Sequence, residues 1–159
     1  MVARDLLGKY LVRKVGNKII REKITEVEAY VGEHDLACHS SKGRTKRNEV
    51  MYGSPGTIYV YFVYGMYWML NIVTENRCGA AILIRSTEHY KGPGILTREL
   101  KIDKSLNGKK LGKKNGLWIE SDFKMENSKL KIIRTPRIGV SYAGEIWANK
   151  KYRFLLKTR

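Results

Sequence analysis

The segment from Pro55 to Trp68 constrains the fold of this chain more than any other part of the sequence. It is dominated by aromatic and β-branched residues, which favour extended strands, and Tyr64-Gly65 lies where such a strand would reverse. Successive side chains of a strand face opposite sides, so Tyr59, Tyr61 and Val63 share one face. The segment therefore predicts a β-hairpin that exposes a tyrosine at its tip.

The predicted hairpin has two interpretations. Flat rings on a protruding β-ribbon can wedge between bases or stack on an unpaired base, which is worth about 1–3 kcal/mol per base. A tyrosine-rich sheet core would have the same composition, because core packing and strand propensity favour the same residues. This segment alone leaves both interpretations open.

The net charge favours a nucleic-acid partner. The chain carries 31 lysine and arginine residues against 15 aspartate and glutamate residues, a net charge of +16. Residues 1–100 hold 15 basic and 10 acidic side chains, whereas residues 101–159 hold 16 and 5. An excess of this size attracts phosphate polyanions, although a basic surface without such a partner is the alternative. No long apolar run or basic amphipathic helix points to a membrane.

Length and composition predict one globular domain that spans residues 1–159. The chain is 43% hydrophobic, enough for a packed core, and it has no linker, repeat or low-complexity tract. Its N-terminus lacks the regions of a secretory signal. Cys38 and Cys78 form no Cys-x-x-Cys pair and fit a reducing compartment better than a disulfide scaffold. We therefore expect a cytoplasmic, nucleoid-associated monomer.

The rest of the pattern predicts a β-rich chain with few helices. Residues 6–15 and 19–30 read as a hairpin closed by Gly16-Asn17. A short helix is expected at 33–38, and another over 95–101 after Gly92-Pro93-Gly94. Further strands are expected at residues 67–73, 80–85, 117–120, 131–134, 137–140 and 151–156. Strict alternation in the strand at 19–30 puts four side chains on one face: Ile24, Glu26, Glu28 and Tyr30.

Titratable side chains cluster around that strand. Two glutamates, Glu26 and Glu28, precede Tyr30, and His39 follows nine residues later. Either glutamate alone is better explained by a salt bridge, because the chain offers many cations. A zinc site is a third interpretation, with the candidate ligands His34, Cys38 and His39. Its spacing is cramped, and the signature of zinc nucleobase deaminases is absent.

A set of motifs runs in a fixed order along nearly the whole chain. The segments are Leu6 to Arg13, Glu26 to Tyr30 with Asp35 and His39-Ser40, Pro55 to Tyr67, Asn71-Ile72, Ile82 to Arg85, Gly92 to Gly94, Pro136 to Val140 and Ala143 to Glu145. In order and spacing they resemble the alkyladenine (3-methyladenine) DNA glycosylase family. The tyrosine hairpin and the Glu-Ala-Tyr element are the most specific of these motifs.

The resemblance implies a fold and a DNA-binding mode. The expected fold is a single α+β domain with a curved, mostly antiparallel β-sheet or partial barrel, peripheral helices and a protruding, DNA-inserting β-hairpin. Tyr64 would occupy the gap left when a damaged nucleotide is flipped out of the duplex. The expected partner is double-stranded DNA that contains damaged purines.

The resemblance also implies a base-binding pocket. The flipped purine would lie between the rings of Tyr30 and His39 on one side and Tyr61 on the other, a slot that favours electron-poor alkylated rings. Asn71 and Leu83 match positions on the pocket floor. There the asparagine would crowd the exocyclic 2-amino group of normal guanine.

The catalytic residues implied by the resemblance are Glu28 and Arg85. A carboxylate can stabilise the positive charge that develops on the sugar and accept a proton from the attacking water. Arg85 would help to hold that water, and Glu26, on the same predicted face, would be a structural partner. No lysine lies in the Glu28 or Tyr61 motifs to form a Schiff base, so we expect a monofunctional enzyme that needs no metal or cofactor.

Two features lie outside the strict match. Four cations in a short loop would contact the DNA backbone or remain solvated: Lys42, Arg44, Lys46 and Arg47. The stretch between Arg85 and Gly92 is short for this family, and Ile95 and Ile146 replace more usual residues or spacing. The rival hypothesis is a non-catalytic binder that stacks bases on Tyr59, Tyr61 and Tyr64.

Overall fold

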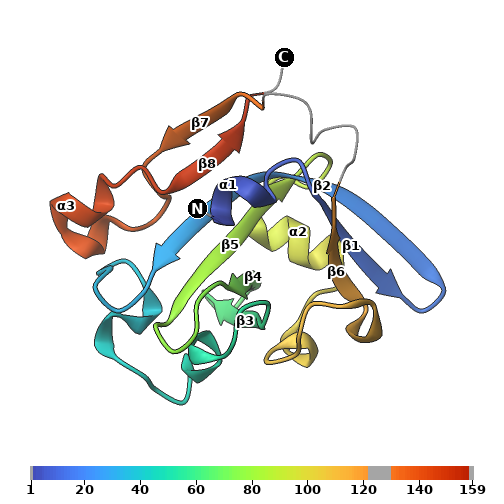
Figure 1. The fold of residues 1–159 in the computed structure, drawn as a ribbon, viewed down its shortest axis with the longest axis horizontal. Helices are drawn as coiled ribbons and strands as arrows, with labels where there is room; N and C mark the ends of the chain where they lie inside the picture. Colours follow the sequence, from blue (N-terminus) through green and yellow to red (C-terminus); the bar gives the residue numbers. More distant parts are fainter. Residues whose placement is uncertain (1, 122–129, 158–159) are drawn as a thin grey trace.

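A long strand, β2 (Lys18–Val31), organises the fold. The computed structural model describes residues 2–121 and 130–157 (Figure 1). The first half of β2 pairs with β1 (Tyr10–Val15), which confirms the predicted N-terminal hairpin. The second half pairs with β5 (Ala80–Thr87) and also with β8 (Arg153–Leu156).

The strands form one antiparallel sheet in the order β3-β4-β5-β2-β1-β6. Its other members are β3 (Ile58–Val63), β4 (Tyr67–Val73) and β6 (Leu117–Glu120), while β7 (Ile132–Thr135) pairs with β8. The sheet curls into a half-barrel, and α2 (Pro93–Glu99) lies within the curl (Figure 1). Two short helices, α1 (Val2–Leu6) and α3 (Gly144–Ala148), are peripheral. The predicted α+β domain with a curved antiparallel sheet is confirmed.

The main core lies between α2 and the sheet. Leu96 and Leu100 of the α2 region are fully buried and pack with residues of β1 to β5. Burying an aliphatic side chain of this size contributes roughly 1.5–3 kcal/mol. The core therefore holds α2 against β4 and β5. The Gly92 amide, just before the helix, donates to the Ser86 hydroxyl near the end of β5.

A β-bulge in β2 corrects the predicted face pattern. The register against β5 shifts between Ile24 and Glu26 and again between Glu26 and Val27. Ile24 packs in the same core cluster as Val27 and Ala29, and not on the face of the two glutamates. A bulge inserts one residue and reverses the alternation of side chains. The prediction that Ile24 shares a face with Glu28 is therefore wrong.

Two predicted elements are also wrong. Residues 33–38 form turns rather than a helix, because the Asp35 carboxylate accepts hydrogen bonds from the backbone amides of Val31 and Ala37. Residues 137–140 form no strand, since Gly139 has a φ of 73° that breaks an extended conformation. The N-terminal strand begins at Tyr10 rather than residue 6. The other predicted strands, and the helix near residue 95, lie within two residues of their expected bounds.

Short 3₁₀ turns complete the fold at His39–Lys42, Glu49–Tyr52, Lys104–Leu106, Lys113–Asn115 and Ser141–Ala143. Across residues 2–121 and 130–157, no helix has the length and apolar character needed to cross a membrane.

Candidate active site

The β3–β4 hairpin ends in an exposed tyrosine, as predicted. The Tyr64 side chain is 84% exposed, and Met66 and Tyr67 beside it are also exposed. The turn closes through a hydrogen bond from the Met66 amide to the Val63 carbonyl, with positive φ angles of 53° at Tyr64 and 62° at Gly65. This conformation costs a tyrosine about 1–2 kcal/mol. A strained, solvent-exposed ring indicates a role in binding rather than in folding.

Aromatic rings build one wall of the site. The His39 and Tyr61 ring centroids are 4.3 Å apart in an edge contact, and Tyr61 stacks on Tyr59 at 5.4 Å. The Tyr59 hydroxyl lies 3.1 Å from Nδ1 of His39. Burial, together with the positive charge of Arg47, lowers the pKa of His39, so the neutral imidazole is favoured. Tyr59 is only 1% exposed, so it supports the wall and cannot itself stack on a base.

These rings border a pocket of about 620 Å³, a size that suits a small ligand or a single nucleotide unit. It opens between the hairpin, the start of α2 and the segment from Ile138 to Tyr142. Many of the residues singled out from the sequence line it: Tyr30, His39, Arg47, Tyr61, Tyr64, Leu83 and Arg85. Lining residues that sequence reasoning missed include Val63, Met69, Ile138, Gly139 and Tyr142.

Asn71 lies next to the pocket but does not line it. Its side chain is buried, and Nδ2 donates long hydrogen bonds of 3.4 Å to the carbonyl oxygens of Tyr59 and Met69. Its strand partner on β5 is Leu83, which does line the pocket. Asn71 and Leu83, the two residues predicted for the pocket floor, are therefore neighbours on adjacent strands, and of the two only Leu83 lines the pocket.

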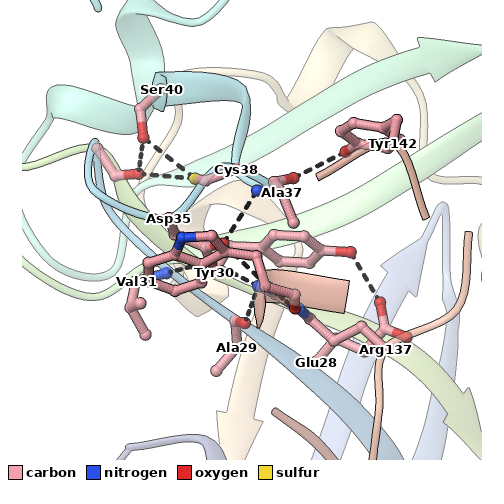
Figure 2. A network of polar contacts seen from close by, with 12 residues as sticks. Glu28, Ala29, Tyr30, Val31, Asp35, Ala37, Cys38, Ser40, Arg137 and Tyr142 are labelled. Carbon is pink, nitrogen blue, oxygen red and sulfur yellow. Dashed lines mark hydrogen bonds and ion pairs between the residues drawn. The ribbon is translucent and has the colours of Figure 1, made fainter. Parts of the chain in front are cut away.

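Glu28 is fully buried directly behind the pocket lining. The Tyr30 hydroxyl donates to Oε2 of Glu28 at 2.8 Å (Figure 2). The Ile138 amide donates to Oε1 at 2.8 Å. Burial and the neighbouring Glu28 charge raise the pKa of Tyr30, so this hydroxyl remains a proton donor. Both oxygens of the carboxylate are thus held by pocket-lining residues.

Arg85 lies between the two glutamates. Its Nε donates to Oε1 of Glu26 at 3.0 Å, while Nη1 lies 3.5 Å from Oε1 of Glu28. Glu26 is further bound by Arg153 at 2.6 Å and by the Ser86 hydroxyl at 2.8 Å. The structure therefore brings the predicted set of Glu26, Glu28 and Arg85 together beside the pocket.

The four predicted backbone-binding cations are all exposed: Lys42, Arg44, Lys46 and Arg47. Arg47 differs from the others because it also lines the pocket, where Nη2 donates to the Phe62 carbonyl at 3.3 Å. Buried Asn48, which sequence reasoning missed, holds this loop. Its Nδ2 donates to the carbonyls of His39 and Gly43, and its Oδ1 accepts the Thr45 amide.

The proposed zinc ligands are used in other contacts. The Cys38 thiol donates to the Gly79 carbonyl and accepts from the Ser40 hydroxyl, and burial raises its pKa. The His34 ring makes an edge contact with Trp147 at 5.7 Å. In the described part of the chain, no three His, Cys, Asp or Glu side chains are placed to hold a metal ion.

One family of known proteins matches this sequence over its whole length. The family model described as Methylpurine-DNA glycosylase (MPG) matches residues 1–91 and 86–159. A relative from Legionella pneumophila (strain Corby), named "Putative 3-methyladenine DNA glycosylase", is 47% identical over 169 aligned residues, covering 99% of this chain and 88% of the relative. A relative of the same name from Methanocella arvoryzae is 44% identical, covering 91% and 80%. Another, from Borrelia garinii subsp. bavariensis, is 41% identical, covering 98% and 89%.

Proposed function

The chain belongs to the methylpurine-DNA glycosylase family, and from this membership we propose that it is a DNA-3-methyladenine glycosylase of base excision repair. Residues 1–159 form one glycosylase domain whose substrate is double-stranded DNA with damaged purines. The observation that carries the proposal is the placement of Glu28. Its buried carboxylate lies behind an aromatic-walled pocket, at the base of a hairpin that exposes Tyr64.

Tyr64 opens the duplex in the proposed mechanism. A ring that protrudes from a β-ribbon can fill the gap in the base stack when a nucleotide leaves it. Met66 and Tyr67 widen the apolar tip that faces the DNA. The flipped base then enters the pocket that opens behind the hairpin.

The pocket selects electron-poor purines by ring contacts. The side chains of Tyr30, His39 and Tyr61 line the pocket that the base would occupy, and aromatic faces attract cationic rings. Of the two expected floor residues, Leu83 lines the pocket and Asn71 does not, so a role for Asn71 in excluding the 2-amino group of guanine is not part of this proposal. The substrates expected on this basis are 3-methyladenine, 7-methylguanine, hypoxanthine and ethenoadenine.

Glu28 performs the hydrolysis. Breaking the N-glycosidic bond builds positive charge on the deoxyribose, which a nearby carboxylate stabilises. The same carboxylate accepts a proton from the attacking water, and Arg85 holds that water beside it. The methylated bases already carry positive charge and leave readily, whereas hypoxanthine and ethenoadenine need a proton as they depart.

The product is an abasic site in an unbroken strand. The pocket lining within the described residues includes the cations Arg47 and Arg85 but no lysine, which supports hydrolysis rather than a Schiff-base step. Water is therefore the nucleophile in this proposal.

A non-catalytic base-stacking protein is the second candidate, and the exposed Tyr64 and Met66 favour it. The buried Tyr59 weakens it, because that ring was expected to form part of the stacking surface. Glu28 distinguishes the two candidates, since a stacking platform needs no buried carboxylate.

Release of free base from duplex oligonucleotides tests the proposal. The duplexes carry 7-methylguanine, hypoxanthine or ethenoadenine, and no metal is added. Wild type is compared with Glu28→Gln and with the matched control Glu22→Gln, a buried carboxylate on the same strand that accepts hydrogen bonds from His89 outside the pocket. We expect release by wild type and by Glu22→Gln, and loss of about 10²-fold or more in Glu28→Gln.

Equal release by wild type and Glu28→Gln would contradict the assignment of Glu28. Binding to DNA without any base release by wild type would favour the stacking candidate.

A further inference from the structure

A buried ion pair joins two residues to which the proposed chemistry gives no role. Asp35 and Arg137 lie 102 positions apart in the sequence, and both side chains are 0% exposed. Arg137 donates to both Asp35 oxygens, at 2.5 Å from Nη1 and 2.9 Å from Nη2 (Figure 2). Burial opposes the charge on Arg137, but the hydrogen bonds and charge of Asp35 outweigh it and raise the Arg137 pKa. The guanidinium is therefore a permanent cation in a fixed orientation.

Arg137 contacts one anchor of Glu28 through the aromatic ring of that anchor. Its guanidinium carbon lies 4.8 Å from the Tyr30 ring centroid, and Nη1 also donates to the Ala29 carbonyl at 2.9 Å. The Tyr30 hydroxyl is the donor to Oε2 of Glu28. A cation against the ring therefore limits how far this hydroxyl can move.

Arg137 fixes the second anchor through the chain. The next residue, Ile138, donates its amide to Oε1 of Glu28 at 2.8 Å. No regular strand or helix holds residues 137–140, so side-chain contacts fix this segment, and the buried Arg137 is the one directly before the Ile138 amide. Both donors to Glu28 are thus next to one guanidinium.

The energetics of the pair favour a role in positioning over a role in stability. Desolvating two charges offsets most of their attraction, and such pairs are often no more stabilising than apolar residues. Among the described residues, Nε of Arg137 is a buried side-chain atom without a hydrogen-bond partner. An unsatisfied buried donor lowers the free energy of unfolding. The ion pair therefore adds little to the free energy of unfolding, but it holds the Arg137 guanidinium in one orientation.

We propose that Arg137, held by Asp35, is a positioning residue that orients the Glu28 carboxylate through the Tyr30 ring and the Ile138 amide. This inference rests on the proposed function, because it assigns a role relative to Glu28 as the catalytic group. Asp35 holds Arg137 in place. Its carboxylate also accepts hydrogen bonds from the backbone amides of Val31 and Ala37, in the segment that leads to His39.

The test separates the chemical step from DNA binding. Two variants are made: Arg137→Lys keeps the charge but loses the two-pronged contact, and Asp35→Asn keeps the shape but loses the charge. Single-turnover base release under enzyme excess gives the rate of the chemical step. Titration of a duplex with a non-cleavable abasic-site analogue gives affinity, and thermal unfolding gives stability. Glu22→Gln is the control for loss of a buried carboxylate on β2 away from the pocket.

We expect both variants to lose about 10²-fold in the chemical step, as small misplacements of a catalytic group do, while affinity changes by less than about threefold. Glu22→Gln should keep the wild-type rate even if its melting temperature falls as far as those of Arg137→Lys and Asp35→Asn. If Arg137→Lys does not fold, the isosteric Asp35→Asn gives the same comparison.

Three outcomes would overturn the inference: a wild-type rate in the variants, a parallel fall of rate and affinity, or an equal rate loss in Glu22→Gln. An inactive wild type would instead remove the proposed function itself. An active wild type with an inactive Glu28→Gln and a fully active Arg137→Lys would remove only the positioning role.

Discussion

At the scale of single residues, two carboxylates two positions apart on β2 occupy different environments. Glu26 accepts from Arg85, Arg153 and Ser86. Burial raises the pKa of Glu26, but the hydrogen bonds from Arg153 and Ser86 and the charges of both arginines outweigh it, so the net shift is downward. The charge of Glu26 therefore orients the side chains of Arg85 and Arg153. Glu28 accepts mainly from two neutral donors that line the pocket, so in the proposed mechanism its charge is available to a sugar cation.

Tyr64→Gly should change stability and activity in opposite directions. Glycine adopts the positive φ of this position without strain, so we expect a gain of about 0.5–1 kcal/mol in the free energy of unfolding. Loss of the inserting ring should lower base release by about tenfold or more, the equivalent of one stacked base. Urea unfolding and single-turnover release measure the two effects. A stability loss of several kcal/mol would mean that the ring is part of the core.

Lowering the pH should destabilise the protein through His39. Burial holds the pKa of His39 below its usual value of 6.5, so below that pH the unfolded chain binds a proton that the folded ring does not. Stability is therefore full above pH 6.5 and falls as the pH drops from 6.5 towards the folded-state value. Glu26 acts in a lower window, because its contribution is lost only as the pH falls from 4.5 through its lowered pKa.

Urea unfolding of wild type and His39→Asn between about pH 5 and 7.5 measures the His39 contribution. The variant should lose part of the pH dependence that wild type shows. Identical pH profiles would show that the ring does not titrate differently on folding.

At the scale of elements, a regular hairpin and an irregular loop together form the aromatic wall of the site. The β3–β4 ladder is continuous from Ile58 to Val63 and carries Tyr61 and Tyr64 in a fixed relation. The loop that presents His39 has only a short 3₁₀ turn of its own, and side-chain hydrogen bonds set its shape. Backbone ladders need no particular side chain, whereas this loop is held by particular side chains, among them Asn48, Ser40 and Cys38.

Asn48→Ala should loosen this loop. It removes two donors and one acceptor from a buried position and leaves the His39 and Gly43 carbonyls without these partners. We expect a loss of about 1–3 kcal/mol in the free energy of unfolding and slower base release. Asn115→Ala, which removes a single bond to the Lys110 carbonyl, is the control and should cost less. Equal losses in the two variants would contradict the role given to Asn48.

At the scale of the whole molecule, the curl of the sheet places the pocket among segments that are distant in sequence. The strand ends, the start of α2 and residues 138–142 meet at one opening. The surface around this opening belongs to a chain with a net charge of +16. Charge of this sign and size favours association with DNA before any lesion is found.

Affinity for undamaged duplex should therefore fall steeply as salt rises. Each phosphate neutralised by a lysine or arginine releases counterions, which gives a slope of about −0.9 per contact in a plot of log K against log salt. Fluorescence anisotropy across a range of salt concentrations measures the slope. Replacing Lys42, Arg44 and Lys46 together with uncharged residues should make the slope of this plot shallower. A flat salt profile in wild type would argue against phosphate contacts.

The sequence by itself determined the features that depend on neighbours along the chain. Alternating side chains and the Tyr64-Gly65 turn predicted the hairpin and its exposed tip, because strand pairing across a tight turn is a local property. The family resemblance implied Glu28, Tyr30, His39 and Arg85 as site residues, and the structure places them together.

Only the tertiary structure decided which partners those residues have. The bulge next to Ile24 changed which side chains of β2 share a face. The segment that begins at Arg137 forms no strand, and Arg137 instead binds Asp35. The Ile138 amide reaches Glu28 across 110 positions, and Arg153 reaches Glu26 across 127. Such contacts depend on how the sheet curls and which strands share an edge. Periodicity along the chain carries no information about that choice, because a local pattern is the same whichever distant strand lies beside it.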